Sequence, residues 1–199
     1  MLIAYPAAEL KVFHAVTRQK SIRETDKLCR ADVCLADAFP ALEKDTTYHY
    51  ASGAAWSAHD MILHFLAFTG PAYVTLATWS LSEGACRQLV SALQDGRITG
   101  MACLFDWRVK TRCPDAVAIA KMANCDVRIN TCHAKVYCLS NTEWGVSIVG
   151  SANLTNNPRI EAGVASTSQQ AEEFHRGWIK AEIAKSQPFG TDFRNGKHF

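Results

Sequence analysis

The feature of this sequence that most constrains its fold is a regular alternation, from residue 55 to residue 185, between strand-forming and helical segments. Strand segments are rich in β-branched and aromatic residues, whereas helical segments repeat apolar residues every three or four positions. The expected helices span 57–68, 82–94, 114–123 and 169–185, and the expected strands span 72–80, 98–107, 127–139 and 146–152. Such alternation is typical of α/β proteins, so we expect a mixed central sheet with helices on both faces.

Residues that start or stop helices mark the borders of these segments. Gly70-Pro71 and Asp95-Gly96 end two helices, since glycine and proline interrupt helical structure. Ser82 can cap the second helix, and Pro114 suits the first turn of the third. No internal repeat is visible, so a site built by these elements occurs once in the chain.

The first 54 residues have a different pattern, and we expect them to form a small helical segment outside a domain of residues 55–199. Residues 8–17 and 22–42 have helical spacing, and residues 45–53 look like a linker. Seven basic residues balance seven acidic ones in this segment. A DNA-reading helix-turn-helix is the minority interpretation; we favour a helical cap or a segment that binds a protein partner.

Overall charge and apolar runs exclude few functions. The chain has 21 Lys+Arg against 19 Asp+Glu, a net charge of +2 and a pI near 8.1, which is mildly compatible with a phosphate-bearing partner. The first ten residues lack the basic start of a secretory signal, and the longest apolar run, 61–68, is too short to span a bilayer. We therefore expect a cytoplasmic protein with no stable insertion in a membrane.

Eight cysteines raise the question of a metal site or of disulfides. They form no Cys-x-x-Cys pair, although structural zinc sites usually contain one. Disulfides are not expected without export from the cell. We expect reduced cysteines packed in the core, with no metal ion and no cofactor.

A group of polar residues near the end of the expected sheet suits phosphodiester chemistry. His133 and Lys135 are two positions apart on an expected strand, as Ser151 and Asn153 are on the next, so each pair shares a face. If the strands pair, the lysine, amide and hydroxyl can bind phosphate oxygens while the imidazole attacks phosphorus. The alternative is a half-exposed strand with ordinary polar positions, because a His-x-Lys pair alone occurs by chance.

His133-x-Lys135, the Gly-Ser-x-Asn of residues 150–153, and Glu161 together resemble the motif of the phospholipase D superfamily, particularly its short bacterial nucleases. The order of strands and helices agrees as well, so the resemblance covers roughly residues 55–185. It implies the α/β/α sandwich of that family and chemistry that needs no metal ion.

The resemblance also implies a role for each motif residue. His133 would be the nucleophile that forms a phosphohistidine, and the same histidine of a second subunit would protonate the leaving oxygen. Lys135 and Asn153 would bind the phosphate with help from Ser151, and Glu161 would hydrogen-bond the imidazole. Because this chain carries one motif where other members carry two, the resemblance implies a homodimer with a composite site.

One position departs from the family pattern. The family usually has an aspartate five residues after the lysine, where this chain has Ser140. The missing aspartate is not the nucleophile, so its loss does not exclude activity. A catalytically silent copy of the fold remains open.

Several further residues are candidates for contacts with a substrate. Arg108, Lys110 and Arg112 follow the strand that ends at residue 107, and they could bind phosphates beside the scissile one or form a solvated loop. Arg159 is a substrate-binding candidate between the two parts of the motif, with pairing to a carboxylate as the alternative. Trp107 and Trp144 could stack on bases or pack in the core.

We therefore expect a metal-independent phosphodiesterase, a homodimeric nuclease that cleaves DNA. A phospholipase or phosphatidyltransferase would use the same residues, but no basic amphipathic helix for membrane docking is visible. The third alternative is a non-catalytic binding or scaffold protein that recruits a partner through residues 1–54.

Overall fold

The computed structural model of the chain describes residues 23–26, 34–53, 55–156 and 159–188. The elements follow in the order β1 (Arg23–Asp26), α1 (Leu35–Ala38), β2 (Thr46–Gly53), α2 (Ala58–Thr69), β3 (Ala72–Thr78), α3 (Glu83–Gln94), β4 (Ile98–Asp106), α4 (Val109–Arg112), α5 (Pro114–Met122), β5 (Asp126–Asn130), β6 (Lys135–Ser140), β7 (Gly145–Gly150), β8 (Ile160–Ser166), α6 (Gln169–Lys185) and β9 (Gln187–Pro188). Within these residues the strands form one sheet in the order β1-β2-β8-β7-β6-β3-β4-β5-β9.

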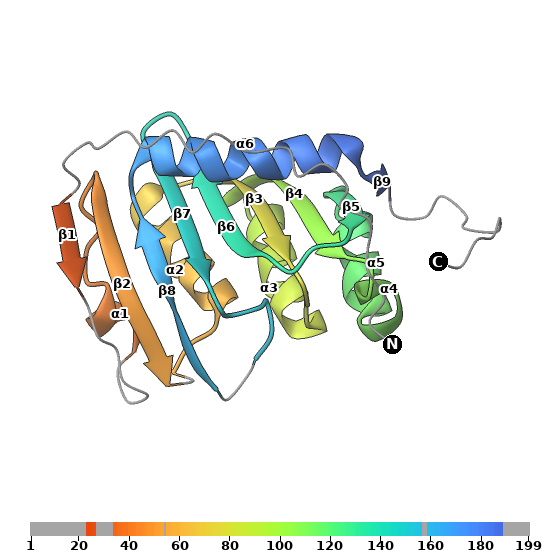
Figure 1. Cartoon of the computed structure of the whole chain (residues 1–199), viewed down its shortest axis with the longest axis horizontal. Helices are drawn as coiled ribbons and strands as arrows, with labels where there is room; N and C mark the ends of the chain where they lie inside the picture. Colours follow the sequence, from red (N-terminus) through yellow and green to blue (C-terminus); the bar gives the residue numbers. More distant parts are fainter. Residues whose placement is uncertain (1–22, 27–33, 54, 157–158, 189–199) are drawn as a thin grey trace, which may run out of the picture.

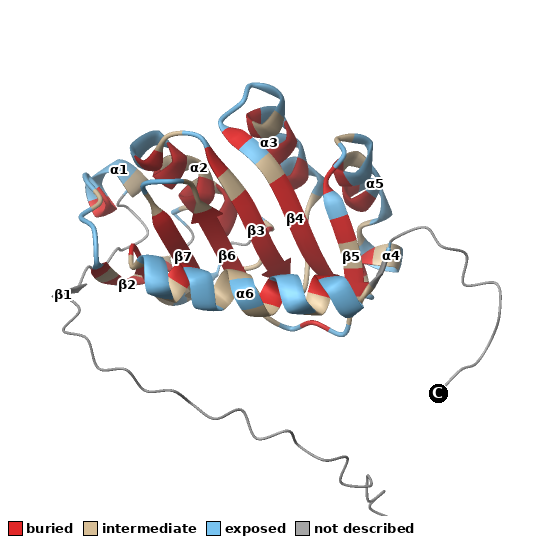
Figure 2. Ribbon diagram, turned by 90° about the horizontal axis from the view of Figure 1, so that it is seen from above, coloured by how far each residue is buried: buried red, intermediate tan, exposed pale blue. Residues whose placement is uncertain are grey.

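The sheet is mixed and lies between two layers of helices (Figures 1 and 2). Strands β3, β4 and β5 are parallel to one another, whereas β6 is antiparallel to β3, and β7 and β8 continue the antiparallel arrangement. Helix α6 covers one face, and α2, α3 and α5 cover the other (Figure 2). The expected α/β/α sandwich with a mixed central sheet is confirmed.

Each face of the sheet buries its own apolar cluster, because successive side chains of a strand point to opposite faces. In β6, Tyr137 belongs to the larger cluster under α2 and α3, whereas its neighbour Val136 belongs to the smaller cluster under α6. Ile179 and Ile183 of α6 are buried in that smaller cluster. Phe174 of the same helix, by contrast, is 69% exposed.

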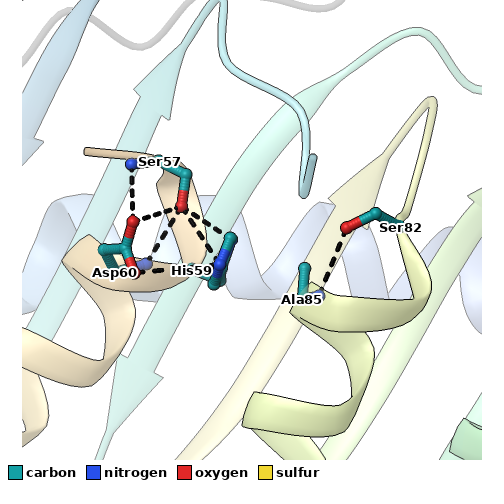
Figure 3. Close-up of polar contacts among 5 residues, drawn as sticks. All are labelled: Ser57, His59, Asp60, Ser82 and Ala85. Atoms are coloured by element: carbon teal, nitrogen blue, oxygen red, sulfur yellow. Dashed lines mark hydrogen bonds and ion pairs between the residues drawn. The ribbon is translucent and has the colours of Figure 1, made fainter. Parts of the chain in front are cut away.

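The two expected start signals, Ser82 and Pro114, are confirmed, and Ser57 is a further cap that was not expected. Ser57 caps α2 by accepting a hydrogen bond from the Asp60 amide, and Ser82 caps α3 by accepting one from the Ala85 amide (Figure 3). Pro114 occupies the start of α5 as expected. Because α2 and α3 follow β2 and β3, both helices begin at the same edge of the sheet (Figure 1).

The expectation of one strand over residues 127–139 is wrong. This stretch contains β5 and β6, which lie on opposite sides of β4 and β3 in the sheet. Residues 131–134, which we call the crossover, carry the chain from β5 to β6 past the ends of β4 and β3 (Figure 1). A local pattern does not separate the two strands, since a crossover of this kind is itself made of extended backbone.

Two expectations for the first 54 residues are also wrong, and a third lies outside the described residues. Residues 46–53 are not a linker but strand β2, which pairs antiparallel with β8. Residues 22–42 do not form one helix, because β1 and the single turn α1 are the elements described there. The helix expected at 8–17 is not among the described residues. Along β2, buried residues alternate with exposed or partly buried ones, as expected for a strand that turns one face to the core.

Residues before position 54 contribute directly to the core of the sandwich. Phe39 is fully buried, and its ring makes edge-on contacts with the rings of Tyr48, Tyr50, Trp56 and Phe65. Edge-to-face arrangements of this kind are the favoured geometry of aromatic pairs. The segment between α1 and β2 is therefore packed as part of the same core as α2.

We predict that Phe39→Ala lowers the free energy of unfolding by about 3–5 kcal/mol, because it removes a large side chain from a filled core. Phe174→Ala is the matched control at an exposed position of α6, and its effect should stay within about 0.5 kcal/mol. Urea unfolding followed by circular dichroism measures both values. Equal effects of the two substitutions would show that the segment before residue 54 is not part of the folded core.

Candidate active site

His133 lies on the crossover, and a buried carboxylate at the end of β4 holds this segment in place. Asp106 is fully buried, and its Oδ2 accepts a hydrogen bond from the backbone amide of Cys132 at 3.1 Å. Its Oδ1 accepts one from Nε of Arg108 at 2.6 Å and one from the Arg108 amide at 3.1 Å. The carboxylate therefore ties the crossover to the loop that follows β4.

The hydrogen bonds to Asp106 stabilise its charged form. Burial alone would raise the pKa of this carboxyl group, but the hydrogen bonds from Arg108 and from the Cys132 amide outweigh burial, so its pKa is lowered. The Cys132 side chain is buried in the cluster under α6, as expected for a residue beside an exposed His133.

The two residues of the His-x-Lys motif lie against the ring of Trp79, which follows β3. The His133 imidazole meets this ring edge-on, with ring centres 5.6 Å apart. Lys135 Nζ lies 5.9 Å from the ring centre and donates a hydrogen bond to the His133 carbonyl oxygen at 2.9 Å. Burial lowers the pKa of the Lys135 ammonium group, while the charges of Cys132 and Glu161 oppose this shift. Lys135 is half-buried, whereas the His133 side chain is exposed and can be reached by a ligand.

Asn153 is connected to the motif through Thr78, the last residue of β3. Thr78 is the register partner of Lys135, and its hydroxyl lies 3.4 Å from Asn153 Oδ1, although the Ser80 carbonyl oxygen at 3.1 Å is the nearer acceptor for its proton. Tyr137 stabilises the same loop by donating to the Ala152 carbonyl oxygen at 2.7 Å. This arrangement leaves the Asn153 amide N–H groups without a partner among the described residues. The expectation that Asn153 lies on a strand is wrong, because β7 ends at Gly150.

Ser151 and Glu161 pair with each other beside this group. The Ser151 hydroxyl donates a short hydrogen bond to Glu161 Oε2 and accepts one from the Ala162 amide at 3.0 Å. Within one chain, the hydrogen bond that we expected between Glu161 and His133 is not formed among the described residues. Glu161 Oε1 keeps no protein partner there.

Tyr50 of β2 packs beneath this part of the site. A Cβ atom added to Gly163 would lie 2.5 Å from the Tyr50 hydroxyl and 2.5 Å from the Val149 carbonyl oxygen, and one added to Gly150 would lie 2.8 Å from the same hydroxyl. The two glycines face each other on β7 and β8, so they give the tyrosine room under the Ser151–Glu161 pair. Burial, with a smaller effect of the Glu161 charge, raises the pKa of Tyr50 well above its ordinary value.

The remaining substrate-binding candidates lie in different surroundings. The Arg108 guanidinium is engaged by Asp106, whereas Arg159 is exposed just before β8. Lys110 is half-buried on α4, and burial lowers its pKa. Arg112 stacks over the Trp79 ring at 5.1 Å. Sequence reasoning missed Trp79, although its place directly after β3, at the edge where other polar residues gather, was a usable signal.

The structure also gives places to the two tryptophans that we considered for base stacking. Trp107 is 53% exposed at the edge of the sheet where His133 lies, so it stays a candidate for contact with a ligand or a partner. Trp144 packs against the main core near the turn between β6 and β7, with Lys44 Nζ 5.0 Å from its ring centre. Packing is therefore the role of Trp144.

Ser140, which replaces the usual motif aspartate, lies at the far end of β6 from Lys135. Its hydroxyl contacts Glu172 of α6, a buried carboxylate that pairs with Arg176 at 2.7 Å. An aspartate at position 140 would meet this second carboxylate in a buried environment. The departure from the family pattern is thus associated with α6 and leaves the residues around His133 untouched.

A cluster of Ser57, His59 and Asp60 at the start of α2 has the residue types of a catalytic triad but the hydrogen bonds of a helix cap (Figure 3). The single hydroxyl proton of Ser57 goes to Asp60 Oδ2 at 2.6 Å, because a carboxylate can only accept. His59 Nδ1, 2.7 Å from the Ser57 oxygen, must then donate its own proton. An imidazole that donates to the hydroxyl cannot act as its general base, so this cluster caps α2.

Comparisons with known proteins agree with this description of the fold. No family model and no curated protein matches the sequence. Among solved structures, the phospholipase D family member Nuc from Salmonella typhimurium is similar with a TM-score of 0.51 and 15% identity, over 67% of this chain and 91% of that chain. NucT from Helicobacter pylori has a TM-score of 0.50 and 15% identity, over 66% of this chain and 92% of its own.

A third similar structure is that of TrmBL2, an archaeal chromatin protein, with a TM-score of 0.53 and 11% identity over 74% of this chain and 54% of that chain. Together these similarities show that the chain has the phospholipase-D-like fold. Identities this low establish the fold and leave the activity to the site itself.

The described residues lack two features that would point to other functions. They contain no group of three or more His, Cys, Asp or Glu side chains arranged to hold a metal ion. They also contain no helix with the length and apolar character needed to cross a bilayer.

We predict that Asp106→Asn lowers the free energy of unfolding at neutral pH by about 1–3 kcal/mol, because Arg108 loses its charged partner and the Cys132 amide a strong acceptor. The contribution of the charged carboxylate is fully present above the ordinary aspartate pKa of about 3.9 and is lost as the pH falls through the lowered pKa of the folded state. Urea unfolding of both proteins between about pH 7 and about pH 2 should therefore show a difference that shrinks on acidification.

Asp95→Asn is the control, because it removes a carboxylate from the exposed pair of Asp95 with Arg97 at the opposite edge of the sheet. Its effect should be much smaller than that of Asp106→Asn. A loss of stability at Asp106 that is independent of pH would contradict an anchoring role of its charge.

Proposed function

We propose that this protein is a metal-independent phosphodiesterase, a homodimeric nuclease that cleaves DNA phosphodiesters through a phosphohistidine intermediate. One observation carries the proposal. His133, Lys135 and Asn153 lie at one edge of a phospholipase-D-like sheet, where Trp79 and Thr78 connect them. An exposed imidazole, a half-buried ammonium group and an amide with free N–H groups are a nucleophile and two donors for phosphate oxygens.

The proposed reaction has two displacements at phosphorus. A nitrogen of the His133 imidazole attacks, a nitrogen–phosphorus bond forms, and the bond from phosphorus to the leaving oxygen breaks. The leaving oxygen takes a proton from the His133 of the partner subunit. That second imidazole then removes a proton from water, and the oxygen of this water displaces the first imidazole to release the phosphate product. Lys135 and Asn153 stabilise the charge on the non-bridging oxygens throughout.

The requirement for two histidines is the reason for a dimer. In-line displacement places the nucleophile and the leaving-group acid on opposite sides of phosphorus, and His133 belongs to the only His-x-Lys in the 199 residues. A two-fold axis can supply the second imidazole. Two exposed apolar residues at the same edge of the sheet, Trp107 at 53% and Ile160 at 82% exposure, favour a protein contact there. In the assembled site, Glu161 Oε1 is the atom that we expect to accept a hydrogen bond from the His133 imidazole.

Nucleic acid is the substrate that we favour over a lipid. One structure with the same fold is a phospholipase D family member named Nuc, and another is a chromatin protein described with a novel mode of DNA binding. The cationic groups of Lys135 and Arg112, which lie near His133 around the Trp79 ring, also suit a polyanion.

We predict that the purified protein hydrolyses bis-(p-nitrophenyl) phosphate and linear DNA in the presence of excess EDTA, because the proposed site uses an imidazole nucleophile. His133→Ala should reduce both rates by at least about a hundredfold, in line with the loss of a catalytic nucleophile. His49→Ala is the matched control at an exposed histidine of β2, and it should keep the rates of the parent.

Three results would contradict the proposal in different ways. Loss of activity in EDTA that magnesium or manganese restores would remove the phosphohistidine mechanism. Hydrolysis of phospholipid vesicles with no cleavage of DNA would make the protein a lipase. Absence of hydrolysis of every phosphodiester by folded dimer would indicate a silent binding or scaffold protein.

A further inference from the structure

The ring of Trp79 is surrounded by charged or ionisable side chains. Besides the His133 imidazole, three cations lie over its ring, with Arg108 Cζ at 5.0 Å, Arg112 Cζ at 5.1 Å and Lys135 Nζ at 5.9 Å from the ring centre. Arg108 and Arg112 are the N-cap and the last residue of α4, and Lys135 begins β6. One aromatic ring therefore gathers cations from two separate segments around the proposed nucleophile.

The charges in this cluster do not balance. Arg108 is paired with the buried Asp106 carboxylate. For Lys135 and Arg112, by contrast, no ion pair with a carboxylate is formed in the part of the chain that the structure describes. Two positive charges are thus held against one ring, and neither forms an ion pair with a carboxylate there. Such an arrangement favours an anion that contacts both.

Arg112 also borders a hollow of about 240 Å³ between the starts of α3 and α5. Two acids, Glu83 and Asp115, line the same hollow, and Glu83 is paired with Arg87 at 2.7 Å. Carboxylates repel a phosphate, so this hollow is not the place where we expect the anion. The contact of Arg112 with a phosphate is expected beside the Trp79 ring instead.

We propose that Trp79 is a positioning residue that holds Arg112 next to Lys135, and that Arg112 binds the phosphate adjacent to the scissile one. This inference rests on the proposed function, since Lys135 marks the scissile phosphate. It makes the preferred substrate a chain of successive phosphodiesters rather than an isolated diester. Arg112 takes this role in place of Arg108, whose guanidinium is already engaged by Asp106.

The test is the salt dependence of binding, which requires no turnover. A fluorescent single-stranded oligonucleotide is titrated with full-length dimer in the His133→Ala background, and the logarithm of the association constant is plotted against the logarithm of the salt concentration. Arg112→Gln should weaken binding severalfold and reduce the slope by about 0.7, the value for one lost contact with a phosphate of a single strand. Arg97→Gln removes an exposed arginine at the opposite edge of the sheet and should leave the slope unchanged.

Variants of Trp79 test the positioning role. Trp79→Leu should reduce the slope as much as Arg112→Gln, and the double variant should lose little more, because the arginine contributes only while it is held on the ring. Trp79→Phe keeps an aromatic face and should restore most of the slope. Thermal unfolding confirms that each variant is folded, and a variant that fails to fold is replaced by Trp79→Tyr.

Each result has one interpretation. If the salt-dependence slope of Arg112→Gln equals that of Arg97→Gln, the inference is overturned, whether or not the protein cleaves DNA. The inference is also overturned if Arg112→Gln weakens binding to phosphatidylglycerol vesicles but leaves binding to the oligonucleotide unchanged. A reduced slope in a protein that never hydrolyses a phosphodiester supports the Arg112 contact and contradicts the proposed nuclease activity instead.

Discussion

The site depends on one constraint, the short crossover between β5 and β6. The two strands lie three strand spacings apart, roughly 14 Å, and the five steps from Asn130 to Lys135 reach at most about 17 Å. The crossover must therefore run nearly extended along the edge of the sheet, where its backbone groups lack ladder partners. The Asp106 carboxylate provides a partner by accepting the Cys132 amide, and this hydrogen bond fixes the backbone next to His133. A buried charge is thus used to position an exposed imidazole.

The same edge gathers groups that are far apart in sequence. Thr78 and Trp79 at the end of β3 contact Asn153 on one side and His133 on the other, so β3 connects the two halves of the motif. On the far side of the group, Tyr50 packs its hydroxyl against glycines of β7 and β8. The strand that carries this tyrosine lies before the motif by some eighty residues, yet it supports the loop that the motif uses. The arrangement of the site at this edge therefore depends on the folded sandwich beneath it.

Local patterns predicted those parts of the molecule that local interactions determine. The cap at Ser82, the helix at 169–185 and the motif residues themselves could be identified, because each depends on neighbours within a few positions. Pairing between β2 and β8 could not, since residues 46–53 and 160–166 find their partners only in the folded sheet. The break between β5 and β6 was hidden by extended backbone on both sides. Trp79 was missed for a related reason, because the cations around its ring are brought there by two other segments, residues 108–112 and the start of β6.

The central claim is that two copies of His133 act on one phosphate. The most direct measurement mixes His133→Ala protein with unmodified protein under conditions where subunits exchange, and follows hydrolysis of bis-(p-nitrophenyl) phosphate against the fraction of unmodified chains. A composite site predicts that activity falls with the square of that fraction, because a mixed dimer has a single imidazole and cannot complete turnover. A linear fall would show that each chain works alone, and it would contradict the composite site.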